Sequence, residues 1–459
     1  ERAPAAMWLA AARAIADVLA RTGTDPDDVL AIATSGYGSG LFVVDADHQP
    51  VRPAIQSTDG RGQERLDALG AAGQIDACVK TIGQRMWPAQ ALVLLAWLTE
   101  HEPETVARTH SVLFCKDFLR LRLCGDISTD PTDAGISGLF DVTKNQYAED
   151  VFKRLGLDDW LSKLPPIRPS TEVAGHVSEE AARQTGLRPG TPVARGLLDV
   201  TASALAAGVT TQDQLSVVAG TFSINSSLHK RPRSAFPPFL QSRYPIGDLY
   251  LATEGGATSA SNFDWLCNRV LIGDKKAAEA CDRSIYDVCN ERVAAALERE
   301  NDILFFPFLF GGPKGAPAGY LGLSASSEQA DVLCATFEGI AYAHRYDIER
   351  LLSGPEAATP QVVRLAGGAS NSAVWSQMFA DILNLPVELS AGSELGAKGT
   401  AITAAIAAGA HNDLASAADK MVSTVARYTP QPERQRVYDR KYRRYAKLID
   451  KLADAWGAA

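Results

Sequence analysis

The sequence predicts an α/β fold built from two similar halves. The chain has 459 residues, which is enough for roughly two or three domains of ~150 residues each. Strand-like and helix-like segments alternate through the first half, and the same alternation begins again in the second half. This pattern is typical of α/β domains. We expect one domain at residues 1–208, a second at 209–459 and a cleft between them.

The elements of the first half follow in order. Residues 1–20 have the pattern of an amphipathic helix, and residues 29–36 and 40–55 are strand-like on either side of a turn. Residues 60–73 and 87–103 are helical. Residues 191–212 predict a strand, a turn at 196–199 and a helix of small residues.

The second half repeats this order of elements. Residues 215–229 predict a strand, a Gly-Thr turn and another strand, whereas residues 250–266 predict a strand, a glycine turn and a helix. Residues 362–383 predict a strand, a Gly-Gly turn and a helix. Residues 392–410 are rich in Gly and Ala, which predicts a helix that packs closely against another backbone.

Composition excludes several classes of partner. The net charge is −9, and the one basic run, Arg440–Lys451, has helical spacing, so we expect a solvated helix face and no nucleic-acid site. No apolar run reaches the roughly 18 residues of a membrane span. The seven scattered cysteines include no CxxC pair, which favours reduced thiols in the cytoplasm. We expect a small-molecule substrate, no membrane partner and a homodimer.

The stretch TSGYGSGLFVVD, residues 34–45, contains three glycines that suggest a nucleotide loop. A dinucleotide-binding glycine loop runs from a strand into a helix, where the helix N-terminus faces the phosphates. Here the residues that follow, 41–44, are apolar and strand-like. The stretch therefore needs another function.

Asp199 is the first catalytic candidate, because it lies where a strand is followed by a helix. Its carboxylate would lie beside the positive end of that helix, which suits a general base. An aspartate at this position could equally cap the helix, and the two roles are compatible.

Two glycine turns could hold phosphate or nucleotide. Gly220 lets backbone amides approach phosphate oxygens, and Thr221 adds a hydroxyl, although a plain hairpin turn has the same pattern. Gly367 and Gly368 precede Ser370 and Asn371, which could contact a nucleotide or only cap the next helix. The P-loop signature GxxxxGK[ST] is absent from the sequence.

Three residues of the first half could bind a sugar. Asp59 and Arg61 in STDGR place an acid and a base at the end of a strand, where they could bind a polyol or form a surface ion pair. Trp87 could stack on a sugar or anchor the core. Asp117 could be a helix cap or a salt-bridge partner inside the domain.

Together, these motifs resemble the FGGY family of carbohydrate kinases over essentially the whole chain. The resemblance rests on their order, which runs through TSGYGSG, STDGR, FCKDFLRLRLCGDISTDPTDAG, GTPVARGLLDVTASALAAG, VVAGTFS, FFPFLFG, FEGIAYA and LAGGASNSAVWSQMFADILNLPVE, followed by ELGAKGTAITAAIAAG. STDGRGQ and GLLDVTASALAAGV are most similar to the L-xylulose kinase branch. The resemblance implies two ribonuclease-H-like domains of the actin and hexokinase type. It also implies a cleft that binds sugar on the first domain and ATP with Mg²⁺ mainly on the second.

The resemblance assigns roles residue by residue. Asp199 matches the catalytic base, and Thr221, with Gly220, matches the turn that faces the transferred phosphate. The adenosine loop matches Gly367, Gly368, Asn371 and Ser372, and Ala260 is implied to lie near the nucleotide. Tyr37, Gly38 and Ser39 match the sugar loop, where D-xylulose kinases have Gln-Met-His.

This sequence differs from the family pattern in two further places. Val200 stands where D-xylulose kinases often have Asn, which leaves room for another ketose or polyol. The family's opening Asp-x-Gly-Thr loop, whose aspartate helps to place the metal, has no counterpart in the sequence. We expect that loop upstream of residue 1, and the metal ligands are therefore unknown.

The sequence therefore predicts an ATP-dependent kinase that phosphorylates the terminal hydroxyl of a pentulose, with D- or L-xylulose as the first expectation. Erythritol, glycerol and ribulose are alternative substrates. A scaffold that binds sugar and ATP without transfer is the alternative from another class.

Overall fold

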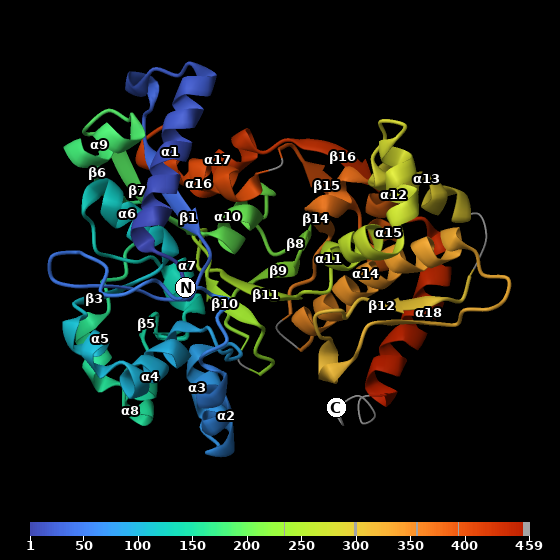
Figure 1. The fold of residues 1–459 in the computed structure, drawn as a ribbon, viewed down its shortest axis with the longest axis horizontal. Coiled ribbons are helices and arrows are strands. Elements are labelled where there is room, and N and C mark those ends of the chain that lie inside the picture. Colours follow the sequence, from blue (N-terminus) through green and yellow to red (C-terminus); the bar gives the residue numbers. More distant parts are fainter. Residues whose placement is uncertain (234, 298–300, 355–356, 393, 453–459) are drawn as a thin grey trace. The chain divides into compact units, whose positions relative to one another are not determined.

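A computed structural model describes residues 1–233, 235–297, 301–354, 357–392 and 394–452. Helices and strands alternate through both halves, which confirms the α/β class (Figure 1). The chain divides into two compact units. The first comprises Glu1–Thr210, Leu228–Ala252 and Glu394–Val422, and the second comprises Thr211–Ser227, Thr253–Ser393 and Ser423–Ala459. Two segments beyond residue 208 thus pack with the first unit, and the domain boundary expected there stays a prediction.

The first unit contains a three-stranded sheet in the order β1-β7-β6. Strand β1 (Ile32–Gly36) runs parallel to β7 (Pro192–Leu198), and β6 (Val173–His176) is antiparallel to β7. Helices α1 (Pro4–Thr22), α6 (Cys115–Cys124), α10 (Asp199–Ala206) and α16 (Leu395–Ala407) pack around these strands.

Smaller elements complete the first unit. In chain order they are β2 (Phe42–Val44), α2 (Gln63–Ala71), α3 (Ile75–Ile82), α4 (Ala91–His101), α5 (Pro103–Arg108), β3 (Ser111–Leu113), α7 (Pro131–Ile136), β4 (Phe140–Asp141), β5 (Gln146–Tyr147), α8 (Glu149–Leu155), α9 (Glu179–Thr185), β10 (Leu240–Arg243) and α17 (Leu414–Met421). Strand β2 pairs with β3, so the two strand-like segments around residues 37–41 enter different sheets and form no hairpin.

Helix α16 packs tightly against α10, as its Gly/Ala composition predicted. A Cβ atom at Gly399 would lie 1.9 Å from the Ala202 carbonyl oxygen, so a larger residue would push the helices apart. This contact fixes α10, and with it the turn that carries Asp199.

The second unit is built on a mainly parallel region of sheet. Strand β8 (Gln214–Ala219) runs parallel to β14 (Val362–Ala366), which runs parallel to β15 (Val387–Ser390). Antiparallel strands flank this group, with β9 (Ser223–His229) beside β8 and β16 (Thr424–Tyr428) beside β15. Because β8 and β14 are parallel neighbours, the loops that follow them lie at the same edge of the sheet.

The other elements of the second unit are mostly helices. They are α11 (Ala260–Trp265), α12 (Ile272–Glu279), α13 (Ile285–Ala296), β12 (Leu304–Phe306), β13 (Gly319–Leu321), α14 (Gln329–Leu351), α15 (Ala373–Leu383) and α18 (Pro432–Lys451), while β11 (Tyr250–Gly256) begins at the end of a first-unit segment. Helix α18 contains the basic run and buries only one side, which includes Tyr438, Tyr442 and Tyr445. Among the described residues, no helix has both the length and the apolar character needed to cross a membrane.

Candidate active site

Asp199 lies at the junction between β7 and α10. Strand β7 ends at Leu198, and Asp199 is the first residue of α10. In the parallel pairing of β1 with β7, Gly36 lies opposite Leu198. Because the carboxyl ends of parallel neighbours meet at one edge, the structure brings the loop at residues 37–39 to the turn that carries Asp199.

The surroundings of Asp199 suit a general base. One carboxylate oxygen, Oδ1, accepts a hydrogen bond of 2.7 Å from the Val200 amide. Burial raises the pKa of Asp199 to about 6, although this hydrogen bond acts in the opposite direction. The carboxylate is therefore mainly charged at pH 7 and has a proton affinity suited to taking up a hydroxyl proton.

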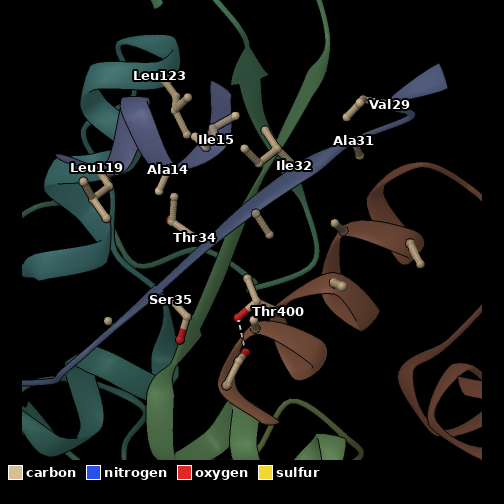
Figure 2. Close-up of a pocket in the computed structure, with 18 of the residues that line it drawn as sticks. Ala14, Ile15, Val29, Ala31, Ile32, Thr34, Ser35, Leu119, Leu123 and Thr400 are labelled. Atoms are coloured by element: carbon tan, nitrogen blue, oxygen red, sulfur yellow. Dashed lines mark hydrogen bonds between the residues drawn. The ribbon is translucent and has the colours of Figure 1, made fainter. Parts of the chain in front are cut away.

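Asp199 also lines a cavity of about 890 Å³ in the first unit. Figure 2 shows Ala14, Ile15, Leu119 and Leu123 on one side of β1, with Thr400 on the other. The walls are mostly apolar, and Thr34, Ser35 and Thr400 add hydroxyl groups. The Ser35 hydroxyl is buried and finds no hydrogen-bond partner among the described residues. Ser35 is therefore a polar candidate that the sequence motifs did not identify.

The loop at residues 37–39 packs closely against the Asp199 turn. A Cβ atom at Gly38 would lie 2.0 Å from Ile136 Cδ1 and 2.5 Å from Leu198 Cδ1. Ser39 is fully buried with a left-handed φ of 59°, and its hydroxyl has no partner in the described part of the chain. Burial raises the pKa of Tyr37, so its hydroxyl stays protonated and can donate. Packing thus accounts for Gly38, while sugar contact by this loop stays a prediction.

The other predicted sugar residues are already in contact with protein groups. Arg61 binds both carboxylate oxygens of Asp59, through Nε at 2.8 Å and Nη2 at 3.0 Å, and its Nη2 also contacts Glu1 at 2.8 Å. The Trp87 ring packs against Phe239 at 5.3 Å between centroids. The structure therefore brings Asp59 and Arg61 together as an ion pair at a turn, and their contact with sugar stays a prediction.

The predicted nucleotide residues gather in one pocket of the second unit. Its volume is about 410 Å³, and its lining includes six of the predicted residues, which are Gly220, Thr221, Ala260, Gly368, Asn371 and Ser372. Gly367 lies beneath this lining, where its φ of 84° allows the backbone to pass against Ala219. The pocket follows the carboxyl ends of β8 and β14, which is where α/β sheets commonly bind ligands.

The same pocket contains residues that the motifs did not reveal. Phe263, Tyr286 and Trp375 provide aromatic walls, and Asp264, Asp287 and Asn290 provide polar groups. The Ser372 hydroxyl donates to Asn290 Oδ1 at 2.7 Å and accepts the Trp375 amide at 3.1 Å. These residues come from α11, α13 and α15, so no single sequence motif contains them.

A buried histidine contacts the residue before Ala260, which lines this pocket. His344 Nε2 lies 3.0 Å from the Ser259 hydroxyl, just before Ala260, and Nδ1 lies 2.8 Å from Asn225 Oδ1 on β9. Burial lowers the pKa of His344 to about 3, so the ring is neutral at physiological pH. An isolated histidine gave no signal in the sequence.

Aromatic surfaces and open glycine backbone in this pocket fit an adenine nucleotide. Among the described residues, no cluster of three or more His, Cys, Asp and Glu side chains could hold a metal ion. Mg²⁺ in kinase sites is bound largely by the nucleotide phosphates, with one or two carboxylates. Asp264 and Asp287 are the carboxylates that line this pocket.

Known proteins match this chain over nearly its full length. It is 30% identical to the L-xylulose/3-keto-L-gulonate kinase of Escherichia coli over 98% of this chain and 89% of that protein. A crystal structure of xylulose kinase from Rhodospirillum rubrum covers 99% of this chain, with 90% of that chain matched, a TM-score of 0.86 and 27% identity. Plasmodium falciparum glycerol kinase with ADP shares the fold, with a TM-score of 0.83 at 17% identity over 97% of this chain and 89% of that chain.

Family models match both halves. The N-terminal domain of the FGGY family of carbohydrate kinases matches residues 1–206, and its C-terminal domain matches residues 215–408. The ordered motifs, the two-part α/β fold and these matches agree. The chain belongs to the FGGY family of carbohydrate kinases.

Proposed function

We propose that this kinase phosphorylates the terminal hydroxyl of a pentulose and that xylulose, with the L isomer first, is its substrate. The observation that carries this proposal is the Asp199 turn, where a carboxylate with a raised pKa lies beside the loop that follows β1. The choice of L-xylulose rests on the relatives, because three of them carry that name, and the Haemophilus influenzae protein is 30% identical over 97% of this chain.

In the proposed reaction, Asp199 acts as the general base. It accepts the proton of the terminal hydroxyl while that oxygen forms a bond to the γ-phosphorus, and the bond to ADP breaks. General-base assistance of this kind contributes roughly 10²–10⁴-fold. Positioning of the acceptor and neutralisation of phosphate charge supply the rest.

ATP with Mg²⁺ is the phosphoryl donor in this family. In our proposal, the backbone at Gly220 and the Thr221 hydroxyl bind the γ-phosphate. Ala260, Gly368 and Asn371 contact the nucleoside, with Gly367 and Ser372 holding the loop in shape. Mg²⁺ would neutralise phosphate charge, and Asp264 or Asp287 would be its protein ligand.

On the sugar side, Tyr37 and Ser39 are the proposed specificity residues. They flank Gly38, which packs against Leu198 in the Asp199 turn, and the Ser39 hydroxyl has no protein partner among the described residues. Asp59, Arg61 and Trp87 are the weaker part of the assignment, because the first two already pair with each other. Substituting Gln-Met-His for the whole loop is a poor test, since Met at residue 38 would collide with Ile136 and Leu198.

A coupled ADP-release assay on the full-length protein tests the proposal. The panel contains L-xylulose, D-xylulose, 3-keto-L-gulonate, ribulose, erythritol and glycerol. We expect the highest kcat/KM with a xylulose isomer and a changed substrate order in Tyr37→Phe and Ser39→Ala. A preference for erythritol or glycerol would overturn the substrate assignment, and ADP release without dependence on sugar would overturn the proposed transfer.

Two further properties belong to this proposal. We expect a homodimer in the cytoplasm, as composition and cysteine usage suggested. Sedimentation equilibrium across a range of protein concentrations would test the dimer, and fractionation of the source cells would test the location.

A further inference from the structure

Side chains from elsewhere in the first unit hold the backbone around Asp199. The Leu198 amide donates a hydrogen bond of 2.9 Å to the Thr132 hydroxyl. Three residues earlier, the Arg195 carbonyl accepts a hydrogen bond of 2.9 Å from Arg120. A buried side chain therefore holds the last amide of β7, directly before the proposed base.

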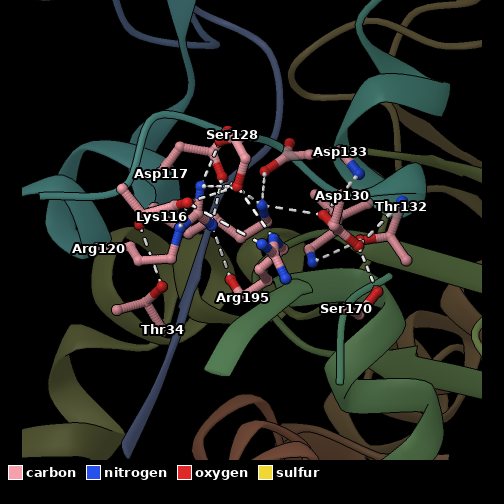
Figure 3. A network of polar contacts seen from close by, with 12 residues as sticks. Thr34, Lys116, Asp117, Arg120, Ser128, Asp130, Thr132, Asp133, Ser170 and Arg195 are labelled. Carbon is pink, nitrogen blue, oxygen red and sulfur yellow. Dashed lines mark hydrogen bonds and ion pairs between the residues drawn. The ribbon is translucent and has the colours of Figure 1, made fainter. Parts of the chain in front are cut away.

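The Thr132 hydroxyl belongs to a network of buried polar and charged side chains (Figure 3). The Thr132 hydroxyl donates to Asp130 Oδ2 at 2.7 Å, and the same oxygen accepts the Ser170 hydroxyl at 2.6 Å. The other oxygen, Oδ1, lies 2.9 Å from Lys116 Nζ. These four side chains are at most 5% exposed, so water screens the network poorly.

In the part of the chain that the structure describes, the Asp199 carboxylate accepts a hydrogen bond from within its own turn. Its hydrogen bond from the neighbouring Val200 amide is local and moves with the same turn. The direction of the carboxylate therefore depends on the backbone at residues 198–200, which the Thr132 hydroxyl holds from outside the turn.

We propose that Thr132 is a positioning residue for phosphoryl transfer, holding the Leu198 amide so that the Asp199 carboxylate points at the acceptor hydroxyl. Asp130 and Lys116 keep the Thr132 hydroxyl in the rotamer that accepts this amide. The inference rests on the proposed role of Asp199. It extends that role to a residue that need not touch the substrate.

The central test compares two buried threonine hydroxyls, each of which accepts a hydrogen bond from a backbone amide. Thr185 is fully buried, donates to the Ala181 carbonyl at 2.8 Å and accepts the Leu187 amide at 3.2 Å, at the end of α9. Thr132→Val and Thr185→Val therefore each remove a buried hydroxyl that accepts a backbone amide in the first unit, although Thr132 donates to a carboxylate and Thr185 to a backbone carbonyl. Thr132→Ser keeps the hydroxyl and serves as the conservative variant.

We expect Thr132→Val to lower kcat by about ten- to a hundredfold, because small misplacements of a reacting group cost this much. The KM for the sugar should change less than about threefold, since ground-state binding does not need the base. Thr132→Ser should restore most of kcat, and Thr185→Val should keep it. Thermal unfolding identifies the general loss of stability that both valine variants share.

Equal kcat in Thr132→Val and Thr185→Val would overturn the positioning role, as would a Thr132→Ser variant as impaired as Thr132→Val. Asp199→Asn, measured in parallel, separates the two proposals, because its retained activity would mean that the base itself is assigned wrongly. If Thr132→Val does not fold, Ser170→Ala provides the test, since it removes one donor to Asp130 and so loosens the carboxylate that fixes the rotamer of the Thr132 hydroxyl. We then expect a several-fold loss of kcat at unchanged KM, and an unchanged kcat would overturn the inference.

Discussion

Replacing Asp199 with Asn should remove activity and stabilise the protein, and the size of the second effect should depend on pH. The neutral amide keeps the shape of the side chain but cannot accept a proton. We expect kcat to fall by roughly 10²–10⁴-fold. We also expect a gain in the free energy of unfolding, because a charged group is removed from a partly buried position.

The structure sets the magnitude of this gain. Burial raises the pKa of Asp199 from an ordinary 3.8 to about 6, so the folded state holds its proton more tightly than the unfolded state. The protonated form therefore favours folding at low pH, and this stability is lost as pH rises through 6. Fully above that range, the loss is at most about 3 kcal/mol. Asn does not titrate, so the variant should gain up to about 3 kcal/mol at pH 8 and only about 1 kcal/mol at pH 4.5.

Urea unfolding at pH 4.5 and pH 8 measures this difference, alongside ADP release at pH 8. Asp17→Asn on the exposed side of α1 is the matched control, because it makes the same change of side chain at an exposed position. A variant that keeps a tenth of the original kcat would refute the catalytic role of Asp199. An equal stability gain at both pH values would refute the claim that burial sets its pKa. The Cys115 thiol lies close enough to interact with the Asp199 carboxylate, and its own pKa is raised by burial.

Four other substitutions test separate parts of the structure. Gly367→Ala forces a left-handed φ of 84° on alanine and a Cβ 2.6 Å from a carbonyl carbon, so the KM for ATP should rise while the sugar KM stays constant. Lys441→Met leaves the buried Glu338 without its ion-pair partner and should cost about 3–5 kcal/mol in urea unfolding. Burial raises the pKa of Asp133, so Asp133→Asn should destabilise the protein less than Lys116→Met, which leaves the buried Asp130 without its ion-pair partner and should cost about 3–5 kcal/mol in urea unfolding.

Local patterns in the sequence predicted most individual elements. Hydrophobic periodicity located α4, and the strand-turn-helix pattern located β7 followed by α10. These local patterns could not predict which strands pair, because β2 pairs with β3 across about 70 residues of chain. The choice of partner strand depends on how both faces of the strand become buried after folding, and a short stretch of sequence does not contain that information.

The site was predictable where backbone chemistry requires particular residues. Glycine turns after strands are recognisable in the sequence, and six residues predicted in this way line one pocket. The aromatic residues of this pocket could not be recognised in the sequence. Phe263, Tyr286 and Trp375 lie on three helices with the spacing of ordinary core residues. The network of buried charged side chains around Lys116 and Asp130 was equally difficult to predict. The exception is Asp117, for which a salt bridge inside its domain was one of two expectations, and the structure confirms this salt bridge.

Opposite charges in that network lie in contact, which lowers the cost of burying them. Burial raises the pKa of Asp133 well above its ordinary value, although the nearby lysine acts in the opposite direction. Three cations, Lys116, Arg120 and Arg195, pair with the carboxylates of Asp117, Asp126 and Asp130, and Arg195 also pairs with the more exposed Glu172. Even a paired cluster of this kind is often no more stable than well-packed apolar residues, so stability alone is a weak reason for it. Apolar side chains, however, cannot accept the Leu198 amide or donate to the Arg195 carbonyl. The cluster thus supplies directional bonds at the end of β7, where the backbone must present Asp199 in one orientation.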